Sequence, residues 1–157
     1  MDPLPRALCW GVLEEMTMHA TLPGSALIEV IARAIGSESE LPVAEHLMSR
    51  ALQVLRFFAD PKWAEMEGWR LFSDALLTIA QQPSFGVDQQ LIAFTTFCQC
   101  KLNEDQTRLL WDIWAAQSLE PANINDLQLD TDIRWTVLTA LAAHGLVTQY
   151  DIDTALA

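Results

Sequence analysis

Apolar residues recur every three or four positions along most of the chain, and no stretch alternates convincingly between apolar and polar residues. The first pattern places side chains on one face of a helix, whereas alternation would indicate a strand. The pattern therefore predicts an all-α fold. The clearest stripes are Leu27, Ile31 and Ile35; Leu47, Met48, Ala51, Val54, Leu55 and Phe58; Trp69, Phe72, Leu76 and Ile79; Leu109, Leu110, Ile113 and Trp114; and Ile133, Val137 and Leu141.

Residues that start and stop helices divide this pattern into segments. Asp60-Pro61 is typical of an N-cap followed by proline in the first turn. Asn103 with Gln106, and Thr148 with Asp151, resemble capping boxes. Gly36 and Gly145 follow apolar stripes, where a left-handed residue often ends a helix. We predict about eight helices, near 4–18, 23–35, 40–59, 61–81, 87–99, 104–116, 131–144 and 149–157.

The linkers between these helices are short, except for residues 117–129. Short linkers make consecutive helices antiparallel neighbours, which favours a stacked, HEAT-like helical array. The sequence has no repeat of fixed period, so a closed helical bundle remains an alternative. We expect residues 1–157 to form a single helical-repeat domain.

The last predicted helix has about two turns before the sequence stops at Ala157. A helix this short is marginal unless something packs on it. We therefore expect the chain to be an excised part of a larger C-terminal domain, and we expect its end to fray or self-associate.

Composition then narrows the function classes. Apolar residues form 51% of the chain, which is too much for a disordered segment. The net charge is −12, and residues 102–157 contain nine acidic side chains but only Arg108 and Arg134 as bases. Nucleic acid is not expected as a partner, because phosphate binding depends on clustered Lys and Arg. The charge is compatible with a basic partner or with solubility alone.

Three cysteines cannot all pair, and the start of the chain lacks the features of a signal peptide. No apolar run is long enough for a membrane span. These features predict a cytoplasmic protein in a reducing compartment, without a membrane partner.

Candidate metal and catalytic motifs are incomplete. Cys98-x-Cys100 is half of a zinc-ligand pattern and lacks a second pair, so these cysteines are expected in the core. Glu15 and His19 share a helix face but do not form the H-E-x-x-H motif of a zinc peptidase. His46 is expected on the polar side of its helix, and His144 near a helix C-terminus.

The polar linker and the tryptophans have simpler interpretations as well. The linker lacks the Gly and the Glu that a calcium loop requires, and Asp130 is expected to cap the next helix. Helical spacing favours packing over ligand stacking for the tryptophans. The linker residues are Asn123, Asn125, Asp126, Asp130 and Asp132, and the tryptophans are Trp63, Trp69, Trp111 and Trp114.

Several stretches together resemble one family. They are Leu4-Pro5-Arg6-Ala7-Leu8-Cys9-Trp10, Ala59-Asp60-Pro61-Lys62-Trp63, Asp130-Thr131-Asp132-Ile133-Arg134-Trp135 with Leu138, Ala140 and Leu141, and Asp151-Ile152-Asp153. In this order and at these spacings they are similar to the C-terminal helical domain of bacterial aminopeptidase N. This gluzincin family shares its C-terminal region with the endoplasmic-reticulum aminopeptidases.

The resemblance implies a parent enzyme that removes N-terminal residues from peptides with zinc. The family's zinc motif, its G-A-M-E-N-like motif and its catalytic Tyr have no counterpart here, so no catalytic, cofactor-binding or metal residue is carried over. The chain would be a non-catalytic part that caps the catalytic domain and walls the peptide cavity. Its partners would be that catalytic domain and, through the parent, peptide substrates.

Two other classes of function are compatible with the residues. The chain could be a free-standing helical adaptor that binds a partner protein or helix in a groove. It could also be a small helical enzyme whose site is not recognisable from sequence.

Overall fold

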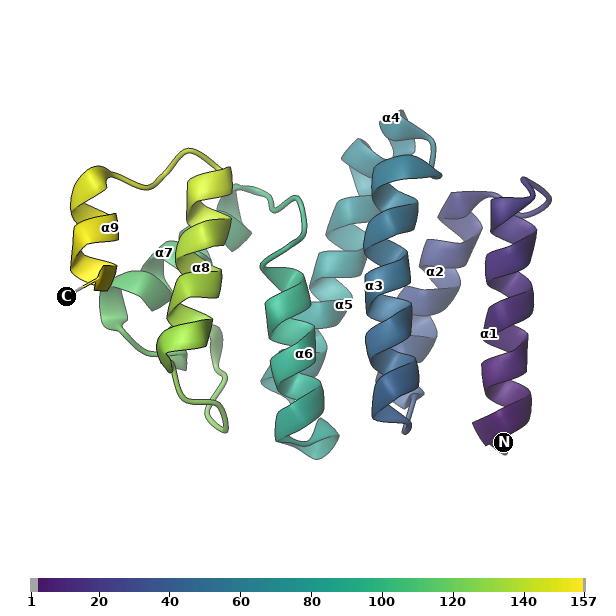
Figure 1. The fold of residues 1–157 in the computed structure, drawn as a ribbon, viewed down its shortest axis with the longest axis horizontal. Helices are drawn as coiled ribbons and strands as arrows, with labels where there is room; N and C mark the ends of the chain where they lie inside the picture. The colour runs from purple at the N-terminus through teal and green to yellow at the C-terminus, as the bar shows by residue number, and fades with distance from the viewer. Residues whose placement is uncertain (1–2, 157) are drawn as a thin grey trace. The chain divides into compact units, whose positions relative to one another are not determined.

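Helices lie where the hydrophobic pattern predicts them in residues 3–156, which the computed structural model describes (Figure 1). No residue in that range belongs to a strand, so the all-α prediction is confirmed. The α-helices are α1 (Pro3–Met18), α2 (Gly24–Ala34), α3 (Leu41–Phe57), α4 (Pro61–Trp63), α5 (Trp69–Gln81), α6 (Val87–Phe97), α7 (Glu104–Ala116), α8 (Thr131–Ala143) and α9 (Gln149–Leu156). A π-helical turn, η2 (Ala64–Gly68), joins α4 to α5, and 3₁₀ turns form η1 (Ile35–Ser37), η3 (Pro83–Phe85) and η4 (Glu120–Ala122).

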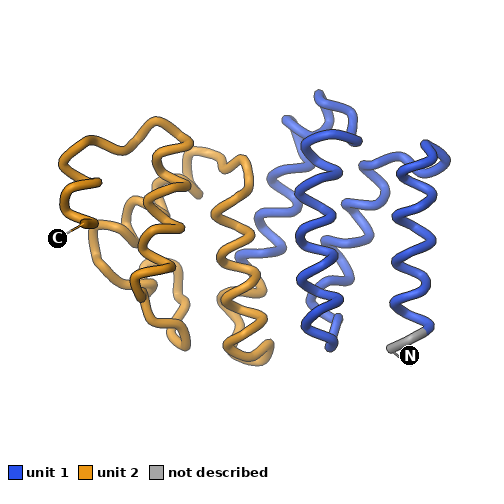
Figure 2. Tube along the Cα trace, in the orientation of Figure 1, with its two compact units in different colours: residues 1–77 blue, residues 78–157 orange. Residues whose placement is uncertain are grey.

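The chain divides into two compact units, Met1–Leu77 and Thr78–Ala157 (Figure 2). In unit 1, α2 lies between α1 and α3 and packs on both. In unit 2, α8 packs on α7 and on α9. Consecutive helices therefore lie side by side from α1 to α3 and from α7 to α9, as in the predicted stacked array.

The core contains the predicted stripes, with two departures, Leu109 and Phe58. Leu47, Met48, Ala51, Val54 and Leu55 of α3 are buried, as are the predicted stripes of α2, α5 and α8. In α7, Leu110, Ile113 and Trp114 are buried, while Leu109 is half-buried. Phe58 was expected to extend the α3 stripe, but 43% of its surface is exposed. The α-helix ends at Phe57, so Phe58 no longer follows the helical direction of the stripe.

Most predicted helix ends are confirmed by their hydrogen bonds. Asp60 accepts a hydrogen bond from the Trp63 N–H at 2.9 Å. Asn103 and Gln106 form a complete capping box at the start of α7. Gly145 has φ +71° directly after α8, whereas Gly36 lies inside η1 and has no positive φ. The prediction for Gly36 was wrong because a right-handed 3₁₀ turn continues the chain there.

The predicted helix 61–81 is continuous, but its hydrogen-bond pattern changes at η2. Gly68 ends this π-helical turn next to the Trp63 ring. A Cβ atom at residue 68 would lie 2.6 Å from Trp63 Cζ3 and 2.8 Å from Leu55 Cδ2. Glycine therefore allows the Trp63 ring and Leu55 to pack closely at this turn.

Candidate functional site

A nearly buried carboxylate connects α1 to α3. Glu14 Oε2 accepts a hydrogen bond from Arg50 Nε at 3.0 Å, and Glu14 Oε1 lies 2.9 Å from His46 Nε2. Arg50 also donates to the Gln53 side chain at 2.9 Å. A buried carboxylate needs such partners, because burial without them is costly. His46 does lie on the polar side of α3, where it contacts α1.

A second polar contact holds the start of α1. Arg6 donates from Nε and from a terminal nitrogen to the two oxygens of Glu38, both at 2.8 Å. The Glu38 side chain is only 1% exposed, and the Glu40 N–H donates to it at 3.1 Å. This bidentate geometry is the stronger form of an Arg–carboxylate pair.

Burial and the contacts of Glu38 shift its pKa in opposite directions. Burial would raise the pKa of this carboxyl group, but the Arg6 hydrogen bond, the Glu40 N–H and the Arg6 charge outweigh it and lower the pKa below its ordinary value of 4.5. Glu38 is therefore a carboxylate at neutral pH, and the Arg6 hydrogen bond is the largest of the contacts that lower its pKa.

The outward side of α1 carries apolar residues instead. Leu8 and Val12 are 63% and 58% exposed, and Met16 and Met18 are exposed as well. These side chains line a shallow hollow of about 680 Å³ together with Ala7, Gly11, Glu14, Glu15, His19, Thr21 and Arg50. The hollow is mainly apolar, and the acidic and basic side chains at its rim already contact one another.

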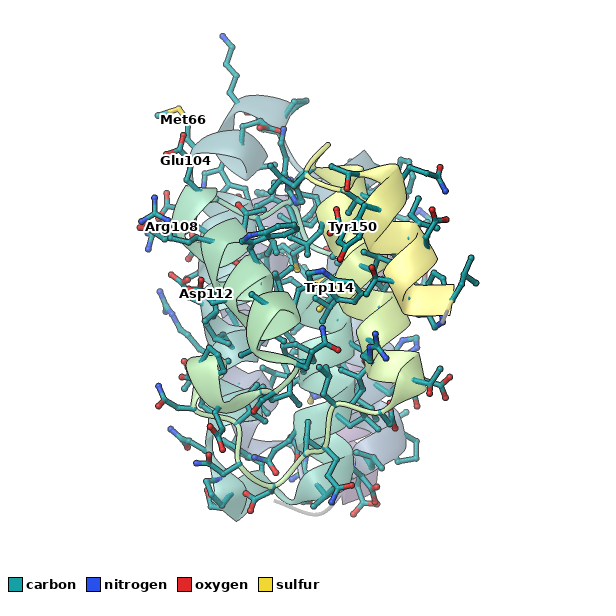
Figure 3. All side chains as sticks on the ribbon, turned by 90° about the vertical axis from the view of Figure 1, so that its left-hand side faces the viewer. Met66, Glu104, Arg108, Asp112, Trp114 and Tyr150 are labelled. Atoms are coloured by element: carbon teal, nitrogen blue, oxygen red, sulfur yellow. The ribbon has the colours of Figure 1, made fainter. Side chains whose placement is uncertain are left out.

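A second hollow, of about 580 Å³, lies beside α7 in unit 2. Leu102 and Thr107 form its buried floor, and Trp111 is 37% exposed in it. Its other lining residues are Glu104, Arg108, His144 and Leu146. Figure 3 shows Glu104, Arg108 and Asp112 along one outer side of α7, and Trp114 on the side nearer α9. The surface is amphipathic and holds no nucleophile–base pair.

The two predicted core cysteines are buried. They follow the end of α6 at Phe97, so the helix predicted to reach residue 99 ends two residues earlier. Burial, with a smaller effect of the nearby Cys100, raises the pKa of the Cys98 thiol far above its usual range. A thiol that stays protonated is a poor nucleophile and a poor metal ligand.

The other candidate ligands remain separate. Glu15 and His19 contact each other at 3.3 Å on the exposed side of α1, as predicted for a pair at a helix end. Asp130 caps α8 by accepting a hydrogen bond from the Ile133 N–H at 2.9 Å, also as predicted. Among residues 3–156, no three His, Cys, Asp or Glu side chains come close enough to hold a metal ion.

The tryptophans have different environments. Trp69 and Trp114 are buried, and the Arg134 guanidinium lies 5.6 Å from the centre of the Trp114 ring. Trp63 is half-buried against Gly68, while Trp111 lies largely at the surface. Packing therefore accounts for three of the four rings, and Trp111 belongs to the hollow beside α7.

The polar contacts of α1 were not predicted from the sequence. Glu14 is 32 residues from His46 and 36 from Arg50, and Arg6 is 32 from Glu38. The sequence feature that could have indicated these contacts is the weak inward stripe of α1. In this stripe Trp10 is followed by Glu14 and Thr17 at helical spacing. Both polar residues are buried, which a solvated helix face would not predict.

None of the described helices is both long and apolar enough to cross a membrane. The family model for the ERAP1-like C-terminal domain matches residues 1–157. Aminopeptidase N of Streptomyces lividans is 28% identical to this chain over 144 residues, which is 92% of the chain. The matched region is only 16% of that relative's length.

Proposed function

Because this chain belongs to the ERAP1-like C-terminal domain family, we propose that it is the non-catalytic helical part of a larger zinc aminopeptidase. The observation that carries this proposal is the family match over residues 1–157, together with the similarity to an aminopeptidase N. The parent would remove N-terminal residues from peptides. Its partner within the molecule would be the catalytic domain of the same polypeptide.

In this proposal the zinc chemistry belongs to the catalytic domain. Zinc in such a site supplies an activated water and polarises the peptide carbonyl. The described residues of this chain do not fit a zinc site, because none of their His, Cys, Asp and Glu side chains cluster in threes. This chain would contribute a wall to the peptide cavity instead of a reacting group.

The charge of the chain supports a role as a cavity wall. Its net charge of −12 would attract the positively charged amino terminus of a peptide. The described helices present their acidic side chains mainly at the surface, as Glu104 and Asp112 of α7 do. Such a wall would favour entry of cationic peptide ends, and raised salt would weaken this effect.

The test compares the 157-residue chain with the full-length reading frame that contains it. Both proteins are purified without chelators, their zinc content is measured, and the release of amine from chromogenic amino-acid amides is followed. We expect about one equivalent of zinc and turnover for the full-length protein, and neither for residues 1–157 alone, with or without added zinc.

A variant of the full-length protein with Gln in place of the Glu of its H-E-x-x-H motif is the control for a contaminating peptidase. Stoichiometric zinc or turnover in the 157-residue chain would contradict the proposal. A reading frame without a zinc motif would contradict it too, and would favour the helical adaptor.

A further inference from the structure

The hollow beside α7 has a buried floor and exposed apolar walls. Leu102 and Thr107 form the floor, and the Thr107 hydroxyl already donates its hydrogen to the Asn103 carbonyl. Trp111 and Leu146 stand beside this floor and are 37% and 47% exposed. The volume of about 580 Å³ lies in the range of small-molecule sites, roughly 300–1,000 Å³. The interior of the hollow therefore suits a small apolar group.

The rim of this hollow carries charges of both signs. Glu104 and Arg108 lie four residues apart on α7, so they are neighbours on the helix surface. Figure 3 shows both on the same outer side of α7. Within residues 3–156, neither of the two side chains forms a hydrogen bond or an ion pair. Both charged groups therefore remain available for a ligand.

The hollow along α1 differs from it in this respect. There Glu14 contacts both Arg50 and His46. Glu15 contacts His19 at 3.3 Å. The charges around that hollow satisfy one another, whereas those beside α7 do not.

The combination of groups decides which ligand fits. A purely anionic ligand would meet the Glu104 carboxylate, and a purely cationic one would meet Arg108 and the His144 side chain. An ammonium and a carboxylate on one carbon atom avoid both conflicts. The Cβ atoms of residues four apart on a helix lie about 5–6 Å from each other, so one amino acid can reach both side chains. Hydrogen bonds between charged groups are the stronger ones.

We propose that the hollow beside α7 binds a free amino acid with an aromatic or branched apolar side chain. The carboxylate of the ligand accepts hydrogen bonds from Arg108, and its ammonium donates to Glu104. Its side chain lies over Leu102 and against the Trp111 ring.

This inference rests on residues 102–146 and not on the proposed function. The two are related in one way, because a parent that removes N-terminal residues would release free amino acids. The site would then bind the class of product that the catalytic domain forms.

The experiment titrates the ¹⁵N-labelled 157-residue chain with L-phenylalanine and follows its amide and indole N–H signals by NMR. A free amino acid has few atoms, so a dissociation constant on the order of 1 mM is expected. The shifts should saturate and should be confined to the amides of residues 102–111 and 144–146 and to the Trp111 indole.

Three related molecules each lack one group of the ligand. N-acetyl-phenylalanine lacks the ammonium, phenylalanine amide lacks the carboxylate, and glycine lacks the apolar side chain. The first two should bind about threefold to fivefold more weakly than L-phenylalanine, as expected for the loss of one exposed ion pair. Glycine should bind more weakly still, because it cannot bury apolar surface in the hollow.

Two substitutions test the charged groups themselves. Glu104→Gln and Arg108→Gln should each weaken the binding of L-phenylalanine about threefold to fivefold. Glu104→Gln should not weaken N-acetyl-phenylalanine further, since that molecule has no ammonium. The matched controls are Asp112→Asn, on the same side of α7, and Arg70→Gln in unit 1, and neither should change binding more than about twofold.

An absence of saturable shifts at about tenfold above the expected dissociation constant would overturn the proposal. Shifts spread over both units would overturn it too, as would equal binding of L-phenylalanine and N-acetyl-phenylalanine. The comparison of ligands needs no substitution, so it decides the question even where a variant does not fold. Zinc content and turnover of the full-length protein judge the proposed function separately, because neither enters this titration.

Discussion

Helices α1 and α3 belong to the same unit but are held in it by different forces. α3 buries a continuous apolar row that includes Leu47, Ala51 and Leu55. α1 buries the Trp10 ring, packs on α2, and is also held by the contacts of Glu14 and Arg6. Similar helical patterns along the chain can therefore correspond to helices with different kinds of attachment.

The difference matters because the two forces respond differently to conditions. Apolar burial contributes about 25 cal/mol per Å² and does not depend on pH. A buried ion pair adds little net stability over an apolar pair, but it costs several kcal/mol when one partner is removed. We therefore expect the attachment of α1 to depend on individual residues and on pH, and that of α3 to depend on packing.

The largest expected effect comes from truncating the α3 core. Leu55→Ala should lower the free energy of unfolding by about 2–5 kcal/mol, because it removes buried methyl groups and leaves a cavity. Phe57→Ala on the same helix is the control, since Phe57 is 75% exposed and should change stability by less than about 0.5 kcal/mol. Urea denaturation followed by circular dichroism measures both. An equal decrease in the free energy of unfolding for the two variants would mean that the wrong face of α3 had been identified as core.

Removing the base from the Arg6–Glu38 contact should have the next largest effect. Arg6→Met leaves the Glu38 carboxylate buried without the hydrogen bonds of its cation, which should cost about 1.5–3 kcal/mol. Arg70→Met is the control, because the Arg70–Asp74 pair is exposed and should contribute less than about 1 kcal/mol. A melting temperature of Arg6→Met equal to that of Arg70→Met would show that the Arg6–Glu38 contact does not stabilise α1.

Acid should weaken the same contact. The folded-state pKa of Glu38 lies below its ordinary value of 4.5, so its contribution to stability is complete above that pH and is lost as pH falls below it. Stability measured from pH 7 to pH 3 should therefore decline more steeply below about 4.5 in the wild type than in Arg6→Met. Parallel curves for the two proteins would contradict this assignment.

The smallest effect on stability is expected from a substitution in the last helix, α9. No residue of α9 is buried, and Leu156 is largely exposed. Leu156→Ala should change the stability of the isolated chain by less than about 0.5 kcal/mol. A loss comparable to that of Leu55→Ala would show that α9 packs tightly in solution.

The sequence predicted features that depend on residues within a single helix. The start of α7 follows from Asn103 and Gln106, three residues apart, and the buried row of α3 follows from spacing within one helix. The contacts of α1 could not be derived in this way, because Glu14 and Arg50 are 36 residues apart. Nothing in the local pattern states which charged residue of one helix meets which of another.

The errors have the same origin. Phe58 continues an apolar pattern, but the helix that would have directed it inward ends one residue earlier. Leu8, Val12 and Met16 have the same helical spacing as a core stripe, yet all three side chains are exposed. Periodicity identifies a face of a helix, but the neighbouring helices determine whether that face is buried.

The most direct test of this account is amide hydrogen exchange of the isolated 157-residue chain at neutral pH, corrected for intrinsic rates. Amides in the core turns of α3 should open only with global unfolding, whereas those of α1 and α9 should open with a clearly lower free energy. We therefore predict lower protection of the amides in α1 and in α9 than of those in α3. If α1 were protected as strongly as α3, its attachment would not differ from core packing, and the comparison on which the account rests would be wrong.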